Sequence, residues 1–249
     1  VGAVCSVMAT LLDELSNKSK QKDINFVFVV RNIKKAQDHF FKNSNILNKS
    51  DFLEIKHFEE IFEDSKKYEK YLKNSDIFIN SSTPSFNLPI MNLALKYNTN
   101  YADLASDIYK DEIISTLKFD QQILENEFKS QNLFALINLG ISPGITNFLI
   151  GEKIHSLKNL PYEVKIKKLE INLLEEIQSK KLIFSWSPKV AIDELAFPPV
   201  FYKKNRPKTI EPFSKSKVYK FPYFRNIVDI YPVFQEELIS LKQSFPQIE

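Results

Sequence analysis

The chain has very few of the residues that build metal sites and disulfide bonds. It contains one cysteine, Cys5, and three histidines, His39, His57 and His155, which lie far apart in the sequence. A single cysteine forms neither an intrachain disulfide nor a thiolate zinc site, and scattered histidines disfavour an imidazole site. The sequence therefore predicts no bound metal, and it favours a reducing, cytoplasmic setting.

Long apolar runs and an excess of one charge are also missing. No stretch holds the roughly 18 uncharged apolar residues that a membrane helix needs, so we expect no membrane partner. Lys and Arg number 34 against 31 Asp and Glu, which gives a net charge of +3, and no tight basic block occurs. This balance predicts no nucleic-acid partner. The apolar content of 43% is instead typical of a globular core.

The two ends of the sequence lack the features of complete termini. The chain begins at Val1, directly on helix-like sequence, with no basic segment or cleavage site of a signal peptide. It stops at Glu249 without a closing element. We therefore expect a fragment of a longer protein, truncated at both ends.

Strands and helices alternate through the first half of the sequence. Apolar runs such as residues 24–30 (INFVFVV) are typical of strands buried on both faces of a parallel sheet. The predicted strands are 24–30, 52–55, 77–79, 100–104 and 133–137, and the predicted helices are 3–15, 32–43, 59–73, 88–97, 107–129 and 144–157. This alternation predicts βαβ units with right-handed crossovers. We expect a Rossmann-like, doubly wound parallel sheet over residues 1–139, incomplete at its N-terminus because the first strand is missing.

The pattern changes after residue 139. Short segments separated by prolines follow, at 164–173, 182–186, 200–203, 208–210, 218–221 and 227–231. In the first of these the alternation changes parity at Lys167 and Lys168, which a β-bulge would explain. We expect a second, mixed α/β domain over residues 140–249, incomplete at its C-terminus.

Three residues of the first domain are placed to bind a dinucleotide. Gly2 precedes an apolar helix, as the last glycine of a G-x-G-x-x-G fingerprint does, although it is also simply a residue near the end of the sequence. Arg31 ends the first apolar run, where an acidic residue would bind the ribose of NAD. Its guanidinium predicts binding of the 2′-phosphate of NADP, with Asn32 as a further donor. The alternative is a solvated arginine at a strand end.

Other polar residues follow the later strands. Ser81, Ser82 and Thr83 come after one of them, where small hydroxyl residues either let the backbone approach a cofactor or form an ordinary capped turn. Asp103 closes the next strand. It is the candidate catalytic residue and a candidate substrate ligand, because a carboxylate there could orient an amine or relay a proton.

Two of the four glycines, Gly140 and Gly144, lie within five residues of each other, between a predicted strand and a helix. Glycines relieve backbone strain and expose N–H groups at a helix start. We predict that Gly140, Ser142 and Gly144 contact the cofactor and that Asn147 contacts the substrate. The alternative is a purely structural turn.

The only tryptophan, Trp186, lies between Ser185 and Ser187. It is either a core residue or the wall of a substrate pocket. Ser187 followed by Pro188 predicts the start of a helix. We assign Ser185, Trp186 and Ser187 to substrate binding, on the hypothesis that the hydroxyls and the turn face an anionic group of the substrate.

Taken in order, these segments resemble the motifs of the saccharopine dehydrogenase (saccharopine reductase) family. Val1-Gly2 is similar to the end of the family's glycine fingerprint, and Val30-Arg31-Asn32 with the following Lys34-Lys35-Ala36-Gln37 is similar to its strand-end arginine segment. The remaining matches are residues 76–89 (DIFINSSTPSFNLP) to "DVVIN…P…NLP", 101–103 to "Y-x-D", 140–144 with Asn147 to the "G-x-x-PG" turn, and 184–188 to the "FSWS" segment.

The resemblance implies a Rossmann domain, a second mixed α/β domain, and NADP or alternatively NAD as the cofactor. The implied activity is that of an NAD(P)-dependent oxidoreductase acting on a C–N bond of an amino-acid derivative, as in lysine metabolism. The implied partner is a small-molecule substrate, and a homo-oligomer is compatible with this reading.

Three departures from the family pattern concern the substrate. Ser142 stands where some members have Asp, Asn147 stands where some have His, and Leu173-Leu174-Glu175-Glu176 lies near the expected "GGLP" turn. Another amino acid or imine is therefore as compatible with the sequence as saccharopine. The same losses leave a second hypothesis, an inactive nucleotide-binding module that acts as a sensor or as an oligomer scaffold.

Overall fold

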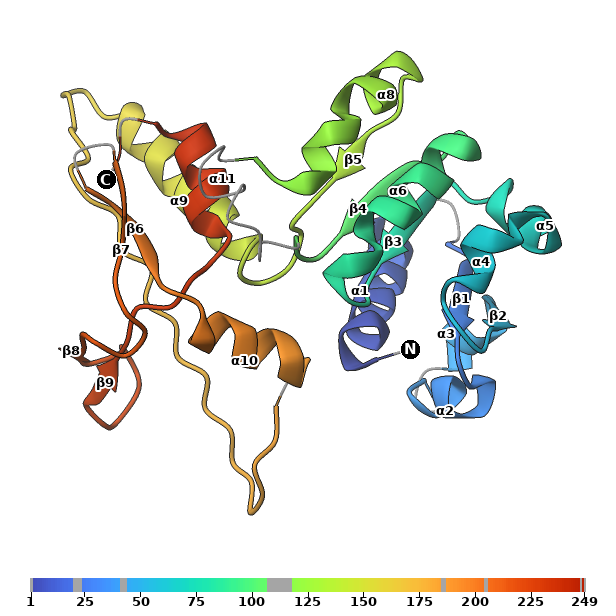
Figure 1. The fold of residues 1–249 in the computed structure, drawn as a ribbon, viewed down its shortest axis with the longest axis horizontal. Helices are drawn as coiled ribbons and strands as arrows, with labels where there is room; N and C mark the ends of the chain where they lie inside the picture. The colour runs from blue at the N-terminus through green and yellow to red at the C-terminus, as the bar shows by residue number, and fades with distance from the viewer. Residues whose placement is uncertain are drawn as a thin grey trace. The chain divides into compact units, whose positions relative to one another are not determined.

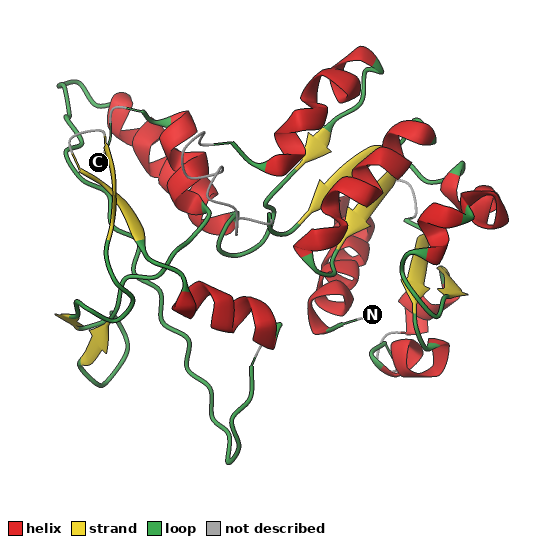
Figure 2. Ribbon diagram, viewed as in Figure 1, coloured by secondary structure: helices red, strands yellow, loops and turns green. Residues whose placement is uncertain are grey.

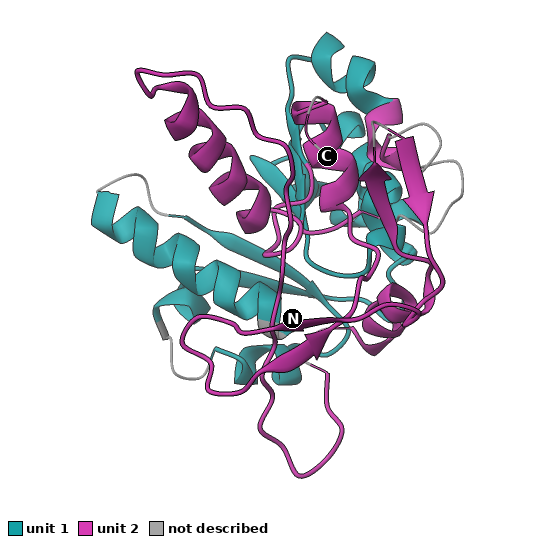
Figure 3. Ribbon diagram, turned by 90° about the vertical axis from the view of Figure 1, so that its left-hand side faces the viewer, with its two compact units in different colours: residues 1–103, 124–136 teal, residues 104–123, 137–249 magenta. Residues whose placement is uncertain are grey.

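Strands and helices alternate along the chain in the computed structural model, which describes residues 2–19, 24–40, 44–106, 118–184, 187–203, 206–246 and 248 (Figure 2). Two units divide these residues (Figure 3). Unit 1 comprises residues 1–103 and 124–136, and unit 2 comprises residues 104–123 and 137–249.

The described strands of unit 1 are all parallel and form two sheets. A two-stranded sheet runs from Phe26 opposite Ser50 to Val30 opposite Glu54. A three-stranded sheet has its strands in chain order. The strands are β1 (Phe26–Val30) and β2 (Ser50–Glu54) in the first sheet, and β3 (Ile77–Asn80), β4 (Asn100–Asp103) and β5 (Ala135–Leu136) in the second. The predicted α/β class with parallel strands is confirmed.

Helices follow the strands of unit 1 in the predicted order. They are α1 (Ala3–Ser19), α2 (Ile33–Asp38), α3 (Ser44–Asn48), α6 (Asn87–Lys96) and α8 (Glu125–Ser130), with a 3₁₀ turn η2 (Pro84–Phe86) before α6. α6 packs against β3 and β4 (Figure 1). This helix-on-sheet packing buries apolar residues of both elements, as a βαβ unit requires.

Two of the longer predicted helices differ from the structure. The segment 59–73 is broken into α4 (Glu60–Glu63), a 3₁₀ turn η1 (Ser65–Tyr68) and α5 (Glu69–Leu72). Asp64 causes the first break, because its φ of −124° and ψ of 57° lie outside the helical region. Of the predicted helix 107–129, residues 107–117 lie outside the described residues. A 3₁₀ turn η3 (Asp120–Leu124) and α8 form the rest.

Two groups of buried apolar side chains form the core of unit 1. The first joins Ala9 of α1 to Phe28 and Val30 of β1, together with Ala36, Phe40 and Ile46. The second contains Ile55, Ile61, Tyr68, Leu72 and Leu93. Phe28 and Val30 are buried, but Val27 between them in the sequence is 38% exposed, so β1 is not buried on both faces as the apolar run 24–30 predicts.

One face of α1 is left open. Val4, Val7, Leu11 and Leu15 are 48%, 59%, 53% and 61% exposed, and their spacing places them along one stripe of the helix. Even so, no helix in the described part of the chain has the length and apolarity that crossing a membrane requires.

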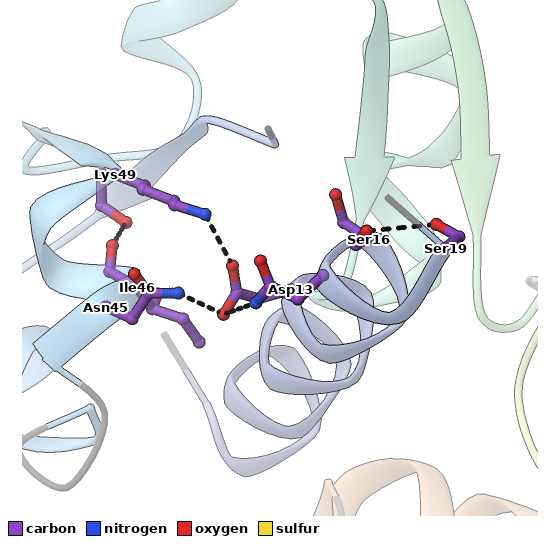
Figure 4. Close-up of polar contacts among 8 residues, drawn as sticks. Asp13, Ser16, Ser19, Asn45, Ile46 and Lys49 are labelled. Carbon is purple, nitrogen blue, oxygen red and sulfur yellow. Dashed lines mark hydrogen bonds and ion pairs between the residues drawn. The ribbon is translucent and has the colours of Figure 1, made fainter. Parts of the chain in front are cut away.

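A buried carboxylate joins α1 to the segment around α3 (Figure 4). Asp13 is 4% exposed, and its oxygens accept hydrogen bonds from Asn45 Nδ2 at 2.7 Å and Asn17 Nδ2 at 3.2 Å. Lys49 Nζ lies 3.2 Å from the other Asp13 oxygen. The amides and the ammonium group together offset the cost of burying the charge.

Unit 2 combines helices with antiparallel hairpins. β6 (Val200–Lys203) pairs with β7 (Arg206–Thr209), and β8 (Lys217–Tyr219) pairs with β9 (Val228–Ile230). The helices are α9 (Ile145–Lys158), α10 (Pro188–Ala196) and α11 (Glu237–Ser244). A small core contains Phe119, Val200, Phe234 and Ile239. Helices and strands occur together here, as the predicted mixed α/β class requires.

The predicted strand at 164–173 is wrong. Residues 159–184 contain neither helix nor strand, and Figure 2 shows them as loop. Leu173 is 51% exposed and Ile171 is 36% exposed. The alternation of apolar residues had no partner strand to supply backbone hydrogen bonds, and a strand without a partner is not stable by itself.

Candidate functional site

The carboxyl end of β1 borders a hollow lined by two cations. The hollow measures about 350 Å³ and is lined by Arg31, Asn32, Lys35 and Ala36. Asn32 Oδ1 accepts a hydrogen bond from Lys35 N at 2.7 Å and so caps α2. Arg31 and Lys35 are both exposed. Two cationic side chains around one hollow suit an anionic group, and Lys35 is a member that sequence reasoning left out of the site.

The loop after β3 is organised by a buried asparagine that ends the strand. Asn80 is 3% exposed, and its Oδ1 accepts from Ser82 N at 3.0 Å and from Ser82 Oγ at 2.8 Å. Its Nδ2 donates to Thr83 O at 3.1 Å and to Asn87 Oδ1 at 2.6 Å. Asn80 thus fixes the backbone of the predicted Ser81–Thr83 segment. Its position at the end of a buried strand is the signal that could have identified it.

The start of α1 lies beside this loop. A hydrogen bond joins the side chains of Cys5 and Ser81, and burial raises the pKa of the Cys5 thiol. Gly2 is exposed, and a methyl group added to it would meet no atom within 4 Å. The structure therefore brings the beginning of α1 and the loop after β3 together, while it gives Gly2 no steric reason to be glycine.

Asp103 belongs to a buried network at the end of β4. It is 0% exposed, as is Tyr101 on the same strand. Burial, with the nearby charge of Asp103 and a hydrogen bond to it, raises the pKa of Tyr101 well above its usual range. Tyr101 Oη also donates to Asn87 Oδ1 at 3.0 Å. Asp103 is therefore linked through Tyr101 to Asn87 at the start of α6, and it has no exposed surface.

The turn before α9 requires both of its glycines. A Cβ on Gly140 would lie 2.6 Å from Leu104 O, and a Cβ on Gly144 would lie 2.1 Å from Gly140 O. Gly144 also has a φ of +130°, which L side chains rarely adopt. The two glycines are therefore required for steric reasons, because backbone atoms of unit 2 lie too close to allow a side chain at either position.

Polar side chains of this turn are bonded to α11. Ser142 Oγ and Thr146 Oγ1 both donate to Glu237 Oε1, the latter at 2.8 Å. Asn147 Nδ2 donates to Ser240 Oγ at 2.7 Å, and Asn147 Oδ1 accepts from Gly144 N at 3.0 Å. Ser142 and Asn147, predicted to touch cofactor and substrate, thus also hold the turn in place.

Glu237 and Ser240 were missed by sequence reasoning. Ser142 and Glu237 are 95 positions apart in the sequence, and no local pattern links them.

A second buried network lies in the same unit. Ser106 Oγ donates to Asn138 Oδ1 at 2.8 Å, and Ser106 N donates to Glu236 Oε1 at 3.1 Å. Glu236 and Glu237 at the start of α11 therefore accept hydrogen bonds from the segments that follow β4 and β5 in the sequence.

The predicted tryptophan site is only partly described. Ser185 and Trp186 lie outside the described residues. Ser187 is the N-cap residue of α10, with Pro188 in the first turn, as predicted, but its side chain makes no capping hydrogen bond. Among the described residues, no group of three or more His, Cys, Asp or Glu side chains could hold a metal ion.

The structure is similar to that of a saccharopine dehydrogenase. The solved structure is the apo, histidine-tagged, L-Glu-forming saccharopine dehydrogenase from Saccharomyces cerevisiae, with a TM-score of 0.67 and 18% sequence identity. The similarity covers 98% of this chain and 51% of the saccharopine dehydrogenase chain, so this chain spans about half of that protein's length. No family model and no curated protein sequence matches this chain.

The likeness to saccharopine dehydrogenase confirms the fold class. At this identity the likeness concerns the arrangement of helices and strands, which is the predicted Rossmann-like α/β architecture followed by a second mixed α/β part. It agrees with the resemblance that the sequence motifs show.

Proposed function

We propose that this chain is the dinucleotide-binding and substrate-binding part of an NAD(P)-dependent oxidoreductase that acts on a C–N bond of an amino-acid derivative. The observation that carries the proposal is the hollow beside Arg31 and Lys35 at the carboxyl end of β1. In parallel α/β sheets, ligands bind beyond the carboxyl ends of the strands. Residues 1–139 would form the dinucleotide domain and residues 140–249 the substrate domain.

The hollow supports NADP as the cofactor. Arg31 can form bidentate, charge-assisted hydrogen bonds to a phosphate, and Lys35 adds a second positive charge on the same hollow. Asn32, the N-cap residue of α2, lines the same hollow and would be a further hydrogen-bonding group for the phosphate. An acidic residue, which would favour the ribose hydroxyls of NAD, is missing from the residues that line the hollow.

The start of α1 and the loop after β3 would hold the rest of the dinucleotide. Gly2 lies at the N-terminal end of a 17-residue helix, where backbone N–H groups and the helix dipole favour an anion such as a pyrophosphate. Ser81, Ser82 and Thr83 lie in the loop that Cys5 contacts and Asn80 shapes. The bound nicotinamide would supply hydride transfer, while these residues bind and orient it.

Asp103 and the turn at 140–147 are the proposed groups around the reacting carbon and nitrogen. Asp103 would orient an amine through the network it shares with Tyr101. Gly140, Ser142 and Gly144 would contact the cofactor, and Asn147 would face the substrate with Ser185, Trp186 and Ser187. The substrate is an amino acid or imine derivative, and the departures at Ser142 and Asn147 leave room for one other than saccharopine.

The test is turnover by the full-length protein. NADPH oxidation would be followed by absorbance with a panel of amino acids paired with 2-oxo acids or aldehydes, and the reverse reaction with secondary amines. We expect turnover with at least one pair, and NADPH to be used in preference to NADH. Tight binding of NADPH without turnover of any substrate pair would contradict the proposed enzymatic activity and favour an inactive nucleotide-binding module.

A further inference from the structure

Residues 164–173 lie in a long, unbent segment of unit 2 whose backbone has no partner in the described part of the chain. From residue 163 to residue 179 the chain runs without helix, strand, turn or bend, and Figure 2 shows it as loop. No backbone-to-backbone hydrogen bond joins residues 164–173 to another described residue. An extended backbone with its N–H and C=O groups open is a template on which a second strand can pair.

The side chains of this segment are divided between its two sides. Glu170 Oε2 lies 3.0 Å from Lys217 Nζ at the start of β8, so Glu170 faces a hairpin of its own chain. In an extended backbone, alternate side chains lie on opposite sides. Leu169, Ile171 and Leu173 therefore share the side opposite to Glu170, and Ile171 and Leu173 are 36% and 51% exposed. A row of exposed apolar side chains indicates a surface that another chain covers.

The charges of the segment are ordered along its length. Within residues 164–176, three lysines come first and three glutamates follow, at Lys165, Lys167, Lys168, Glu170, Glu175 and Glu176. Two copies in parallel, in-register pairing would place like charges opposite each other, which is unfavourable. Two antiparallel copies place the basic half of each segment opposite the acidic half of the other. The segment is therefore complementary in charge to a second, antiparallel copy of itself.

One symmetric register suits both the charges and the apolar row. A twofold axis places one residue of an antiparallel pair opposite its own counterpart. With Ile171 at the axis, Leu169 lies opposite the partner's Leu173, and Lys167 lies opposite the partner's Glu175. Symmetry repeats both of these pairs on the other side of the axis.

The neighbouring registers suit the segment less well. With Glu170 at the axis, two carboxylates meet directly. With Asn172 at the axis, Leu169 lies opposite the partner's Glu175. With Ile171 at the axis, Glu170 lies opposite the partner's Asn172, so no like charges face each other.

We propose that residues 164–175 are the surface on which a second copy of this chain pairs, antiparallel and across a twofold axis at Ile171. The strand that the alternation at 164–173 predicts then forms on association, because the second copy supplies its backbone hydrogen bonds. The two apolar rows cover each other, and Lys167 pairs with the partner's Glu175. The inference is independent of the proposed function, because the segment contains none of the proposed cofactor or substrate residues.

The first test is the oligomeric state of the 249-residue chain, measured by sedimentation velocity over a series of concentrations. We expect a reversible dimer. Ile171→Lys places two ammonium groups together at the axis, so it should raise the dimer dissociation constant at least about tenfold. Ile192→Lys introduces the same charge at a 53% exposed apolar position on α10 and should leave the dissociation constant unchanged.

A charge exchange separates pairing from a general loss of structure. Lys167→Glu places carboxylates opposite each other, and Glu175→Lys places ammonium groups opposite each other, so each variant alone should weaken the dimer. Both substitutions in one chain restore opposite charges at both ends of the register, and the dimer should return. Circular dichroism of each variant checks that the monomer is folded.

The register is tested by cross-linking in a Cys5→Ser background, which removes the only cysteine of the chain. Directly opposite residues have Cβ atoms about 4.5–5.5 Å apart, within reach of a disulfide bond. Ile171→Cys should therefore form a covalent dimer under mild oxidation. Asn172→Cys should form far less, because residue 172 lies opposite residue 170 and not opposite its own copy.

Three results would overturn the inference. A chain that stays monomeric at every concentration has no such interface. A dimer that survives both Ile171→Lys and Lys167→Glu is formed by another surface, such as the exposed stripe of α1. A monomer whose amides at 164–173 are protected from hydrogen exchange pairs this segment within its own chain.

Discussion

Gly144 shapes the turn before α9 through its backbone geometry. Its φ of +130° and the 2.1 Å approach of an added Cβ to Gly140 O leave no room for a side chain. We expect Gly144→Ala to lower the free energy of unfolding by at least about 1–3 kcal/mol, because backbone strain and a clash with a carbonyl group act together. Urea unfolding followed by circular dichroism measures this change.

Gly151, within α9 itself, is the matched control. A Cβ there would meet nothing within 4 Å, so Gly151→Ala should raise the free energy of unfolding by about 0.5–1 kcal/mol through helix propensity. Equal effects of the two substitutions would show that steric demand at Gly144 is not what fixes the turn.

We predict that Arg31 sets the preference for NADPH over NADH. In the full-length protein, Arg31→Asp should weaken NADPH binding by about 1.5–3 kcal/mol for each charge-assisted hydrogen bond lost, and NADH binding much less. Lys34→Asp makes the same change of charge at an exposed neighbour that does not line the hollow, so it should affect both cofactors little. Isothermal titration calorimetry with both cofactors and both variants tests this, and equal losses for NADPH and NADH in Arg31→Asp would sink the assignment.

Among the elements, a buried ion pair between Asp13 and Lys49 contributes to the attachment of α1 to the segment around α3. Asp13→Ala leaves the Lys49 ammonium group, whose side chain is 18% exposed, without its carboxylate. We expect a loss of up to about 3–5 kcal/mol in the free energy of unfolding, because Lys49 loses its carboxylate and Asn17 and Asn45 lose their acceptor. Thermal or urea unfolding monitors the change.

The pair Glu69 and Lys73 provides the comparison on a helix surface. Its side chains are 46% and 62% exposed and lie 2.8 Å apart in an i,i+4 arrangement. Glu69→Ala should change the free energy of unfolding very little, since water screens such pairs. If Asp13→Ala were as mild as Glu69→Ala, the Asp13 cluster would contribute little to holding α1 in place.

At the scale of the whole molecule, the features predicted from sequence are those set by local burial. The apolar runs around Phe28 and Ile79 predicted parallel strands, which are present, although Val27 and Ile77 are 38% and 37% exposed and the strands are not buried on both faces. The order of strands and helices then predicted the α/β class that the structure and its likeness to saccharopine dehydrogenase confirm.

The features that sequence reasoning missed depend on contacts between distant segments. The alternation at 164–173 has no partner strand, and nothing in its own sequence shows that. Glu237 binds Ser142 across 95 positions, which no local periodicity reveals. Lys35 was not among the residues predicted to bind the cofactor. It lines the hollow because the chain after β1 places it beside Arg31.

The open face of α1 gives a prediction for the 249-residue chain. Because Val4, Val7, Leu11 and Leu15 form an exposed apolar stripe, we expect this chain to bind a hydrophobic dye. Replacing Leu11 and Leu15 by Ser should reduce dye fluorescence while changing the unfolding midpoint little, because both side chains are exposed. A monomeric, cooperatively unfolding chain that binds no dye would contradict this.

We propose that unit 1 binds a phosphorylated nicotinamide dinucleotide at the carboxyl ends of its strands. The measurement that tests it most directly is calorimetric titration of the full-length protein with NADPH and, separately, with NADH. We expect one-site binding of NADPH at least about tenfold tighter than that of NADH, as a charge-assisted contact to the additional phosphate requires. Binding of neither cofactor, or equal affinity for both, would contradict it.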